Sequence, residues 1–112
     1  MQSVIHLVSG DEAEQETALA IAENLLADES EGIDDVAVVA QADGVAAIQT
    51  GEGSEEQVRA LLDEDVSFKA CSNTLEMKGL DESDLVDGVE TVSEGAVEVT
   101  RLQTDGYAYL RP

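Results

Sequence analysis

The run VAVVA at residues 36–40 is an unbroken series of apolar side chains with the length of one β-strand. Strands of a parallel sheet that is covered by helices on both faces show no polar alternation, because neither side of such a strand meets water. Two further apolar runs have the same length, VIHLV at residues 4–8 and VSFKA at residues 66–70. The three runs predict strands of a mainly parallel sheet.

Helical segments separate these runs. From Glu12 to about Ala27 the apolar residues recur at helical spacing, and glutamates crowd the first turn, where the helix dipole favours negative charge. The other expected elements are helices or helical turns at residues 44–49, 54–62, 72–77, 81–85 and 93–105, and strands at residues 89–92 and 107–110. This alternation predicts one α/β domain over residues 1–112, with a mainly parallel sheet covered on both faces.

Charge is the strongest compositional signal. The chain has 26 acidic residues against 5 basic ones, a formal net charge of −21, although 43% of its residues are hydrophobic, as in ordinary globular proteins. Salt relieves the self-repulsion of such a surface, because the Debye length falls from about 10 Å at 0.1 M to about 3 Å at 1 M. We therefore expect a folded, halophilic protein whose carboxylates mainly form a solvated surface. The same charge argues against nucleic acid or anionic lipid as a partner, since phosphate binding needs clustered Lys and Arg.

Cysteine and histidine each occur once, as Cys71 and His6. One cysteine cannot form an internal disulfide, and no secretory or membrane-spanning apolar segment is present, so we expect a cytoplasmic protein with no membrane association. One Cys and one His do not make a zinc ligand set. A Walker loop and a G-x-G-x-x-G motif are also absent, so we expect neither a metal nor a nucleotide cofactor.

Cys71 ends the expected strand at residues 66–70 and directly precedes an expected helix that Ser72 or Asn73 can cap. Ligands of open parallel sheets gather beyond the carboxyl ends of the strands, and helix N–H groups at such a place stabilise a thiolate. Lys69 and Lys78 flank the cysteine, in a stretch with very few acids for so acidic a chain. This local basic character indicates thiolate stabilisation or an anionic ligand; exclusion of charge from a buried loop is the alternative.

His6 lies within the first expected strand. A histidine there is either a structural residue or a neighbour of Cys71, in which case it could act as a base or as an ion-pair partner of the thiol. The choice depends on where its side chain points at the carboxyl edge of the sheet.

The segment VSFKACSNTL at residues 66–75 resembles the V-x-F-x-A-C-x-N-T-L segment of the DsrE/DsrF-like family. Similar segments follow the same order over nearly the whole chain: the His6 strand, the helix from Ala18 to Leu26, the Gly95-Ala96-Val97 helix start and the closing residues 101–112. The resemblance implies a three-layer α/β/α fold with a five-stranded, mainly parallel sheet, layered as in flavodoxin, and assembly into oligomers.

The resemblance also implies sulfur chemistry, in which a cysteine carries sulfur as a persulfide between donor and acceptor proteins. Carried over to this chain, Cys71 is the sulfur acceptor, Asn73 and Thr74 shape its loop through hydrogen bonds, Lys69 and Lys78 support it, and His6 is a candidate neighbour.

Two other functions compete with sulfur transfer. In the first, the chain is a non-catalytic module that binds a small ligand or a protein, and Cys71 is only a packed residue. The second, a hydrolase or nucleotide enzyme, has only an analogy of fold and no motif. We also expect a homo-oligomer, a dimer or a trimer, because apolar residues on the short helices can form a contact that molar salt strengthens.

Overall fold

Five parallel strands form one sheet in the computed structural model, which describes all of residues 1–112. The sheet order is β4-β3-β2-β1-β5, so the VAVVA run lies in the central strand. The strands are β1 (Gln2–Leu7), β2 (Asp35–Ala40), β3 (Ser67–Cys71), β4 (Glu90–Val92) and β5 (Tyr107–Leu110). The expected number of strands is confirmed, and the sheet is entirely parallel rather than mainly so.

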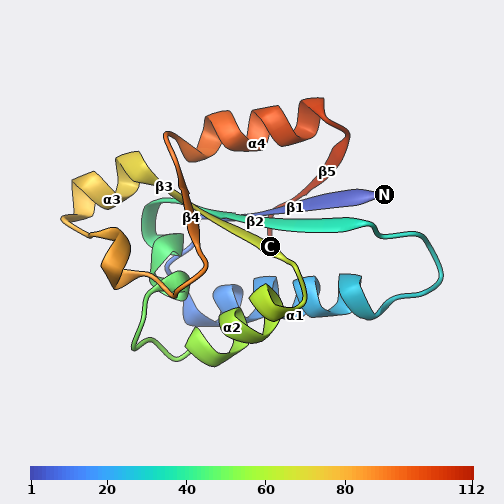
Figure 1. Cartoon of the computed structure of the whole chain (residues 1–112), viewed down its shortest axis with the longest axis horizontal. Helices are drawn as coiled ribbons and strands as arrows, with labels where there is room; N and C mark the ends of the chain where they lie inside the picture. The colour runs from blue at the N-terminus through green and yellow to red at the C-terminus, as the bar shows by residue number, and fades with distance from the viewer.

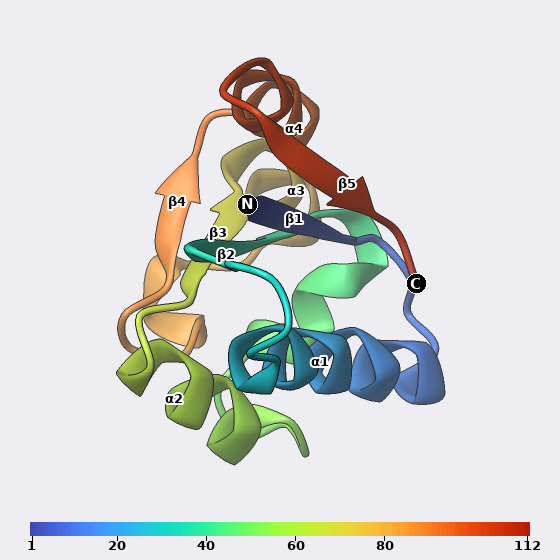
Figure 2. The same cartoon turned by 90° about the vertical axis from the view of Figure 1, so that its right-hand side faces the viewer.

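Helices cover both faces of this sheet. The helices α1 (Glu12–Ala27) and α2 (Glu55–Asp63) lie on one side, and α4 (Gly95–Thr104) lies on the other (Figure 1). The view turned by 90° separates the layers, with α4 above the strands and α1 and α2 below them (Figure 2). The three-layer α/β/α arrangement is therefore confirmed.

Short helical elements complete the connections. These are the 3-10 helix η1 (Ala42–Ile48), the helix α3 (Ser72–Lys78) and the 3-10 helix η2 (Glu82–Asp84). Two ends follow simple rules: Asp11 caps α1 by accepting a 3.0 Å hydrogen bond from the Glu14 N–H, and Gly79 ends α3 in the left-handed conformation, with φ of 67°.

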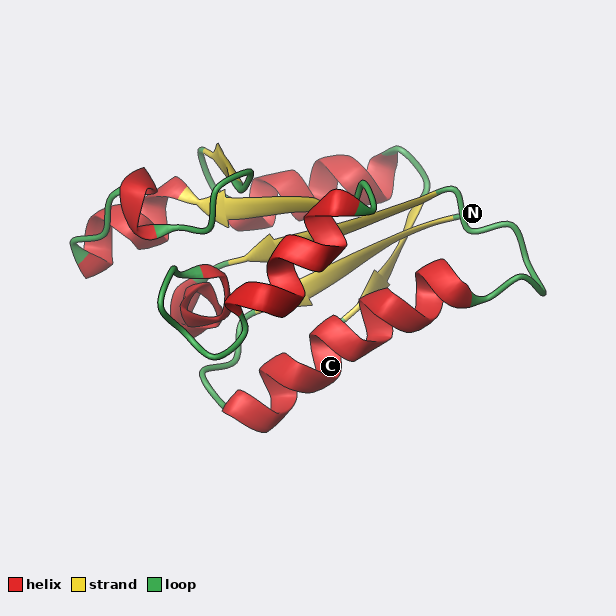
Figure 3. Cartoon of the chain, turned by 60° about the horizontal axis from the view of Figure 1, so that its bottom comes forward, coloured by secondary structure: helices red, strands yellow, loops and turns green.

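Alternating side chains of each strand enter two cores of unequal size. The larger core has 19 buried residues and lies between the sheet and the α1 and α2 side, which Figure 3 turns toward the viewer. The smaller core, under α4, has five: Val4, Ala37, Val39, Val99 and Leu102. The face under α4 therefore has room for polar side chains.

The connection after β2 packs directly against β1. A Cβ atom at Gly44 would lie 2.0 Å from the carbonyl oxygen of Leu7, a distance that no side chain can occupy. Glycine at this position thus lets η1 approach the end of β1, and it keeps Gln41, the one residue between β2 and η1, at the carboxyl edge of the sheet. No helix of the fold combines the length and apolarity needed to cross a membrane.

Candidate functional site

The carboxyl edge of the sheet brings together polar residues from separate strands on the side of α4. Cys71 is the last residue of β3, Gln41 directly follows β2, and Glu94 follows β4 as the N-cap of α4. His6 comes from β1. The parallel direction of the strands places all four at one edge.

Cys71 is buried, with 1% of its surface exposed, and its Sγ lies 3.5 Å from Oε2 of Glu94. The thiol therefore donates a hydrogen bond to a carboxylate. The expectation that Ser72 or Asn73 caps α3 is wrong, because Cys71 itself holds the N-cap position and no side chain bonds to the N–H groups there. The hydrogen bond of the thiol is therefore made to Glu94 and not to the N–H groups of α3.

Glu94 connects the cysteine to α4. Its Oε1 accepts a 3.3 Å hydrogen bond from the N–H of Ala96 in the first turn of α4, while Oε2 faces the sulfur of Cys71. A carboxylate at a helix N-terminus is stabilised by the N–H groups and by the dipole of the helix. The Glu94 side chain is half-buried, and each of its two carboxylate oxygens accepts one hydrogen bond.

The predicted excess of positive charge around Cys71 is not present. Lys69 lies on the same face of β3 but forms an ion pair with Glu98 of α4. Lys78 forms a 2.8 Å ion pair with Asp43 and thereby lowers the pKa of that carboxyl group below its ordinary value. Both lysine charges are therefore compensated by acids that are distant in the sequence.

Glu98 is the centre of a charged cluster under α4. Arg101 donates two hydrogen bonds to it, of 3.0 and 2.7 Å, and Lys69 donates a third from β3. The hydrogen bonds from Arg101, assisted by Lys69 and opposed by burial, lower the pKa of Glu98 to about 2. This cluster ties α4 to the sheet and uses Lys69 for structure.

His6 does not contact Cys71 directly, because β2 lies between their strands. Its Nε2 lies 2.6 Å from Oε1 of Gln41, and its Nδ1 lies 2.6 Å from the hydroxyl of Tyr109. An amide oxygen only accepts hydrogen bonds, so Nε2 is the donor to Gln41, while Nδ1 pairs with the hydroxyl of Tyr109. The three side chains form an ordered array along the carboxyl edge.

Gln41 is the member of this array nearest to α4. Gly95 allows the approach, because a Cβ atom there would lie 2.6 Å from Oε1 of Gln41. The amide oxygen of Gln41 is hydrogen-bonded to His6, while its amide nitrogen has no hydrogen-bond partner in the protein. Since no buried side-chain nitrogen or oxygen of the protein lacks a hydrogen bond, this nitrogen is accessible to solvent.

A groove of about 400 Å³ opens beside these residues, and we call it the carboxyl-edge groove. Its lining comes from the start of η1, from α3 and from the N-cap of α4: Gln41, Ala42, Asp43, Asn73, Thr74, Met77, Lys78 and Glu94. The groove is therefore lined both by Glu94, which accepts the hydrogen bond of the thiol, and by the amide side chains of Gln41 and Asn73.

Thr74 and Asn73 have different roles in this groove. Oγ1 of Thr74 accepts a 3.0 Å hydrogen bond from the N–H of Ala42, whose φ of 51° is left-handed and unfavourable for a residue with a Cβ atom. Thr74 thus holds the strained first residue of η1. Asn73 is exposed, makes no side-chain hydrogen bond and leaves its amide free toward the groove.

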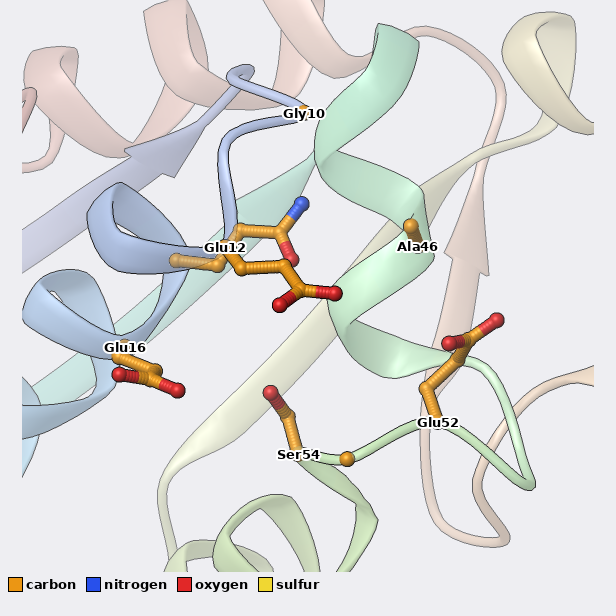
Figure 4. Close-up of a pocket in the computed structure, with 8 residues that line it drawn as sticks. Gly10, Glu12, Glu16, Ala46, Glu52 and Ser54 are labelled. Atoms are coloured by element: carbon orange, nitrogen blue, oxygen red, sulfur yellow. The ribbon is translucent and has the colours of Figure 1, made fainter.

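A second hollow of about 170 Å³ lies on the other side of the sheet, between the first turn of α1, η1 and the segment before α2 (Figure 4). Carboxylates of Glu12, Glu16 and Glu52 surround it, beside Gly53 and Ser54. Three neighbouring negative charges disfavour a phosphate there. No group of three or more His, Cys, Asp or Glu side chains has the arrangement of a metal site.

Glu94, Gln41 and Tyr109 were not identified from the sequence. The rule that selected Cys71, a polar residue where a parallel strand ends, applies equally to Gln41 after VAVVA and to Glu94 between a strand and the glycine that starts a helix. Tyr109 gave no such signal, because the position of β5 next to β1 is not encoded locally.

Comparisons with known proteins agree with this fold. The sequence pattern of the DsrE/DsrF-like family matches residues 2–112. The structure of a protein of unknown function, MTH1491 from Methanobacterium thermoautotrophicum, aligns over 99% of this chain and 98% of its own with a TM-score of 0.93 and 36% identity. The YchN protein of E. coli aligns over the full length of both chains with a TM-score of 0.81 and 21% identity. No curated protein gives a match.

Proposed function

The chain belongs to the DsrE/DsrF-like family, and on this premise we propose that it carries sulfur as a persulfide on Cys71. The contact between the Cys71 thiol and the Glu94 carboxylate, beside the carboxyl-edge groove, is the observation that carries the proposal. A nucleophilic thiol needs a group that can accept its proton and a space in which the reacting partner can bind, and both are present here.

The proposed reaction moves one sulfur atom. Sγ of Cys71 attacks the outer sulfur of a donor persulfide, R–S–SH, so that a new S–S bond forms on Cys71 while the S–S bond of the donor breaks. The donor leaves as a thiol, R–SH, and Cys71 becomes a persulfide. The reverse step passes the sulfur to an acceptor thiol, so the exchange needs no oxidant or reductant.

The carboxyl-edge groove offers hydrogen-bonding groups to the molecule that delivers sulfur. The free amide nitrogen of Gln41 and the free amide group of Asn73 can bind the polar end of a donor molecule, and Thr74 fixes the segment that follows Gln41. Lys78 is neutralised by Asp43, which leaves the groove without an excess of positive charge. A neutral or weakly anionic thiol compound, or a cysteine-bearing protein loop, fits this environment better than a strongly anionic ligand does.

The decisive test is sulfur uptake by the purified protein in molar salt. The protein is incubated with glutathione persulfide and then measured by intact-mass spectrometry and peptide mapping. We expect a mass increase of one sulfur atom on Cys71 and none in the Cys71→Ser variant. Equal uptake by Cys71→Ser, or no uptake by the wild-type protein, would contradict the proposal.

A second candidate function is a binding module in which Cys71 is a packed residue. The 1% exposure of the cysteine favours it, because a sulfur carrier must expose its sulfur during the reaction. Iodoacetamide separates the two functions. Rapid alkylation of Cys71 in the folded protein supports the carrier, whereas protection that lasts until the protein is unfolded by urea supports the module.

We also propose that the chain forms a homo-oligomer, a dimer or a trimer, that exchanges sulfur with donor and acceptor proteins. Exposed apolar side chains support this: 61% of Val97 on α4 and 80% of Met77 on α3 lie in solvent. A hollow of about 360 Å³ next to Val97 gives α4 a surface into which another side chain can pack. Light scattering in molar salt tests the assembly, and a monomer at all concentrations would contradict it.

A further inference from the structure

We propose that Glu94 carries the proton of the sulfur transfer: it takes the proton of the Cys71 thiol and delivers it to the thiolate that leaves the donor. This inference rests on the function proposed above, since it assigns a catalytic role to a second residue of the same reaction.

The position of the carboxylate supports this role. Oε2 of Glu94 lies 3.5 Å from Sγ, and this is the one hydrogen bond that the thiol makes. Oε1 is held by the N–H of Ala96 in the first turn of α4, which fixes the position of the carboxylate beside the sulfur. A carboxylate held in this position can exchange a proton with the thiol.

The other titratable groups near the site are already engaged. Lys69 is bound to Glu98, and Lys78 is bound to Asp43. His6 uses both ring nitrogens, one on Gln41 and one on Tyr109. Glu94 is therefore the group that both touches the sulfur and faces the groove in which a donor would lie.

Each step balances with this assignment. Glu94 accepts the proton of Cys71, and the thiolate attacks the outer sulfur of R–S–SH. The Sγ–S bond forms, the S–S bond of the donor breaks, and R–S⁻ leaves with the electron pair. Glu94 then gives its proton to R–S⁻, so that the products are a Cys71 persulfide, R–SH and an ionised Glu94. Glu94 is unchanged at the end, as a catalyst must be.

The Glu94→Gln variant tests this role because it removes the proton carrier and keeps the shape. Its amide oxygen can still accept from the Ala96 N–H, so the cap of α4 remains. Two reactions of Cys71 are compared at neutral pH, and both need the thiol to lose its proton. Sulfur uptake from glutathione persulfide also expels an alkyl thiolate that must be protonated, whereas alkylation by iodoacetamide expels iodide, which takes no proton. We expect sulfur uptake, which loses both the proton acceptor and the proton donor, to fall about 10²-fold, as for a general acid–base group. Alkylation loses only the proton acceptor and should fall by a smaller factor.

Glu90→Gln is the matched control. It removes the same charge from an exposed position on β4 where the side chain makes no hydrogen bond, and it should leave both rates unchanged. If Glu94→Gln slowed both reactions by the same factor, the delivery of a proton from Glu94 to the leaving thiolate would be refuted. Unchanged sulfur uptake in Glu94→Gln would also overturn the assignment.

A separate pair of probes keeps this inference distinct from the proposed function. If the wild-type protein took up no sulfur, Cys71 could still be offered glutathione disulfide, whose alkyl thiolate needs a proton, and an aromatic disulfide, whose thiolate leaves without one. Selective slowing of the glutathione reaction in Glu94→Gln would support the proton role even then. Equal effects on both disulfides would refute it.

Discussion

Strand β3 presents different residues to the two sides of the sheet. Toward α1 and α2 it presents Phe68 and Ala70, which are buried in the core of 19 residues. Toward α4 it presents Lys69 and Cys71, which bond to carboxylates in the first turn and at the N-cap of α4. One strand thus contributes packing on one side and polar chemistry on the other.

The same contrast holds for the neighbouring strands. On the side of α4 lie His6 and Gln41, with Tyr107 and Tyr109 of β5, while the apolar cluster there has only five residues. No buried polar side-chain atom on either face lacks a hydrogen-bond partner, so the polar face carries no desolvation penalty from unpaired groups. Because the core has 19 buried residues on the α1 and α2 face and five on the α4 face, we expect substitutions on the α4 face to destabilise the fold less.

A matched pair of leucines gives the largest expected effects. Leu19 of α1 and Leu102 of α4 are both buried, one in each core. We expect Leu19→Ala to lower the free energy of unfolding by about 4 kcal/mol and Leu102→Ala by about 2 kcal/mol, because a cavity under a single helix collapses more readily. Urea unfolding of both variants in molar salt measures this difference. Equal losses would mean that the two faces contribute equally to stability.

Removal of the charged cluster under α4 has the next largest effect. Glu98→Gln leaves Lys69 without its carboxylate and should lower the free energy of unfolding at neutral pH by about 2 kcal/mol. Glu56→Gln, on the exposed surface of α2, removes the same charge as a control.

The stability that Glu98→Gln loses relative to the wild-type protein depends on pH, and the direction of that dependence is defined. The pKa of Glu98 is about 2 in the folded protein, below its ordinary value of 4.5, so the folded state favours the ionised form. Its contribution is complete above pH 4.5 and is lost as the pH falls toward 2. Urea midpoints of wild type and Glu98→Gln should therefore converge in acid. A gap that stayed constant down to low pH would show that the carboxylate charge is not responsible.

Thr74→Val tests the segment that carries Gln41. The substitution removes the oxygen that accepts from the Ala42 N–H, and we expect a loss of about 1 kcal/mol, the usual net value of one hydrogen bond. Sulfur uptake should fall as well, because Gln41 and Asp43 lose their fixed place in the groove. Thr74→Ser keeps the oxygen and is the control. If Thr74→Ser lost as much stability and uptake as Thr74→Val, packing of the methyl group would explain both effects.

The sequence predicted the strands well because their signals are local. The apolar runs of β1, β2 and β3 and the glycines near helix ends depend only on neighbouring residues. The position of Cys71 at the end of β3 was predicted for the same reason.

The polar contacts of the site could not be predicted in this way, because they depend on strand order. Lys69 meets Glu98 across 29 positions, and Lys78 meets Asp43 across 35. The residues close to Cys71 in the sequence therefore predicted lysines with uncompensated charge near the cysteine. In the fold, each of these lysines pairs with an acid, and Glu94 contacts the sulfur. The array from Tyr109 to Gln41 likewise depends on β5 pairing with β1.

The smallest change in stability is expected for Tyr109→Phe, which tests whether the array of Tyr109, His6 and Gln41 matters for function. The hydroxyl of Tyr109 lies on the exposed side of His6, so its loss should change the free energy of unfolding by less than about 1 kcal/mol. His6 can then rotate, and the amide of Gln41 loses its fixed orientation toward the carboxyl-edge groove. Sulfur uptake should fall severalfold, while alkylation by iodoacetamide stays the same.

Tyr107→Phe completes this comparison on the same strand. Tyr107 donates a hydrogen bond to Asp35, which raises the pKa of Tyr107 to about 12, and neither residue lines the groove. Tyr107→Phe should lower the free energy of unfolding more than Tyr109→Phe does. Its sulfur uptake should stay at the wild-type level, whereas that of Tyr109→Phe falls. Urea unfolding and the uptake assay measure both quantities. If the two tyrosine variants took up sulfur equally well, the array would be structural, and the functional part of the α4 face would be confined to Cys71, Glu94 and the groove.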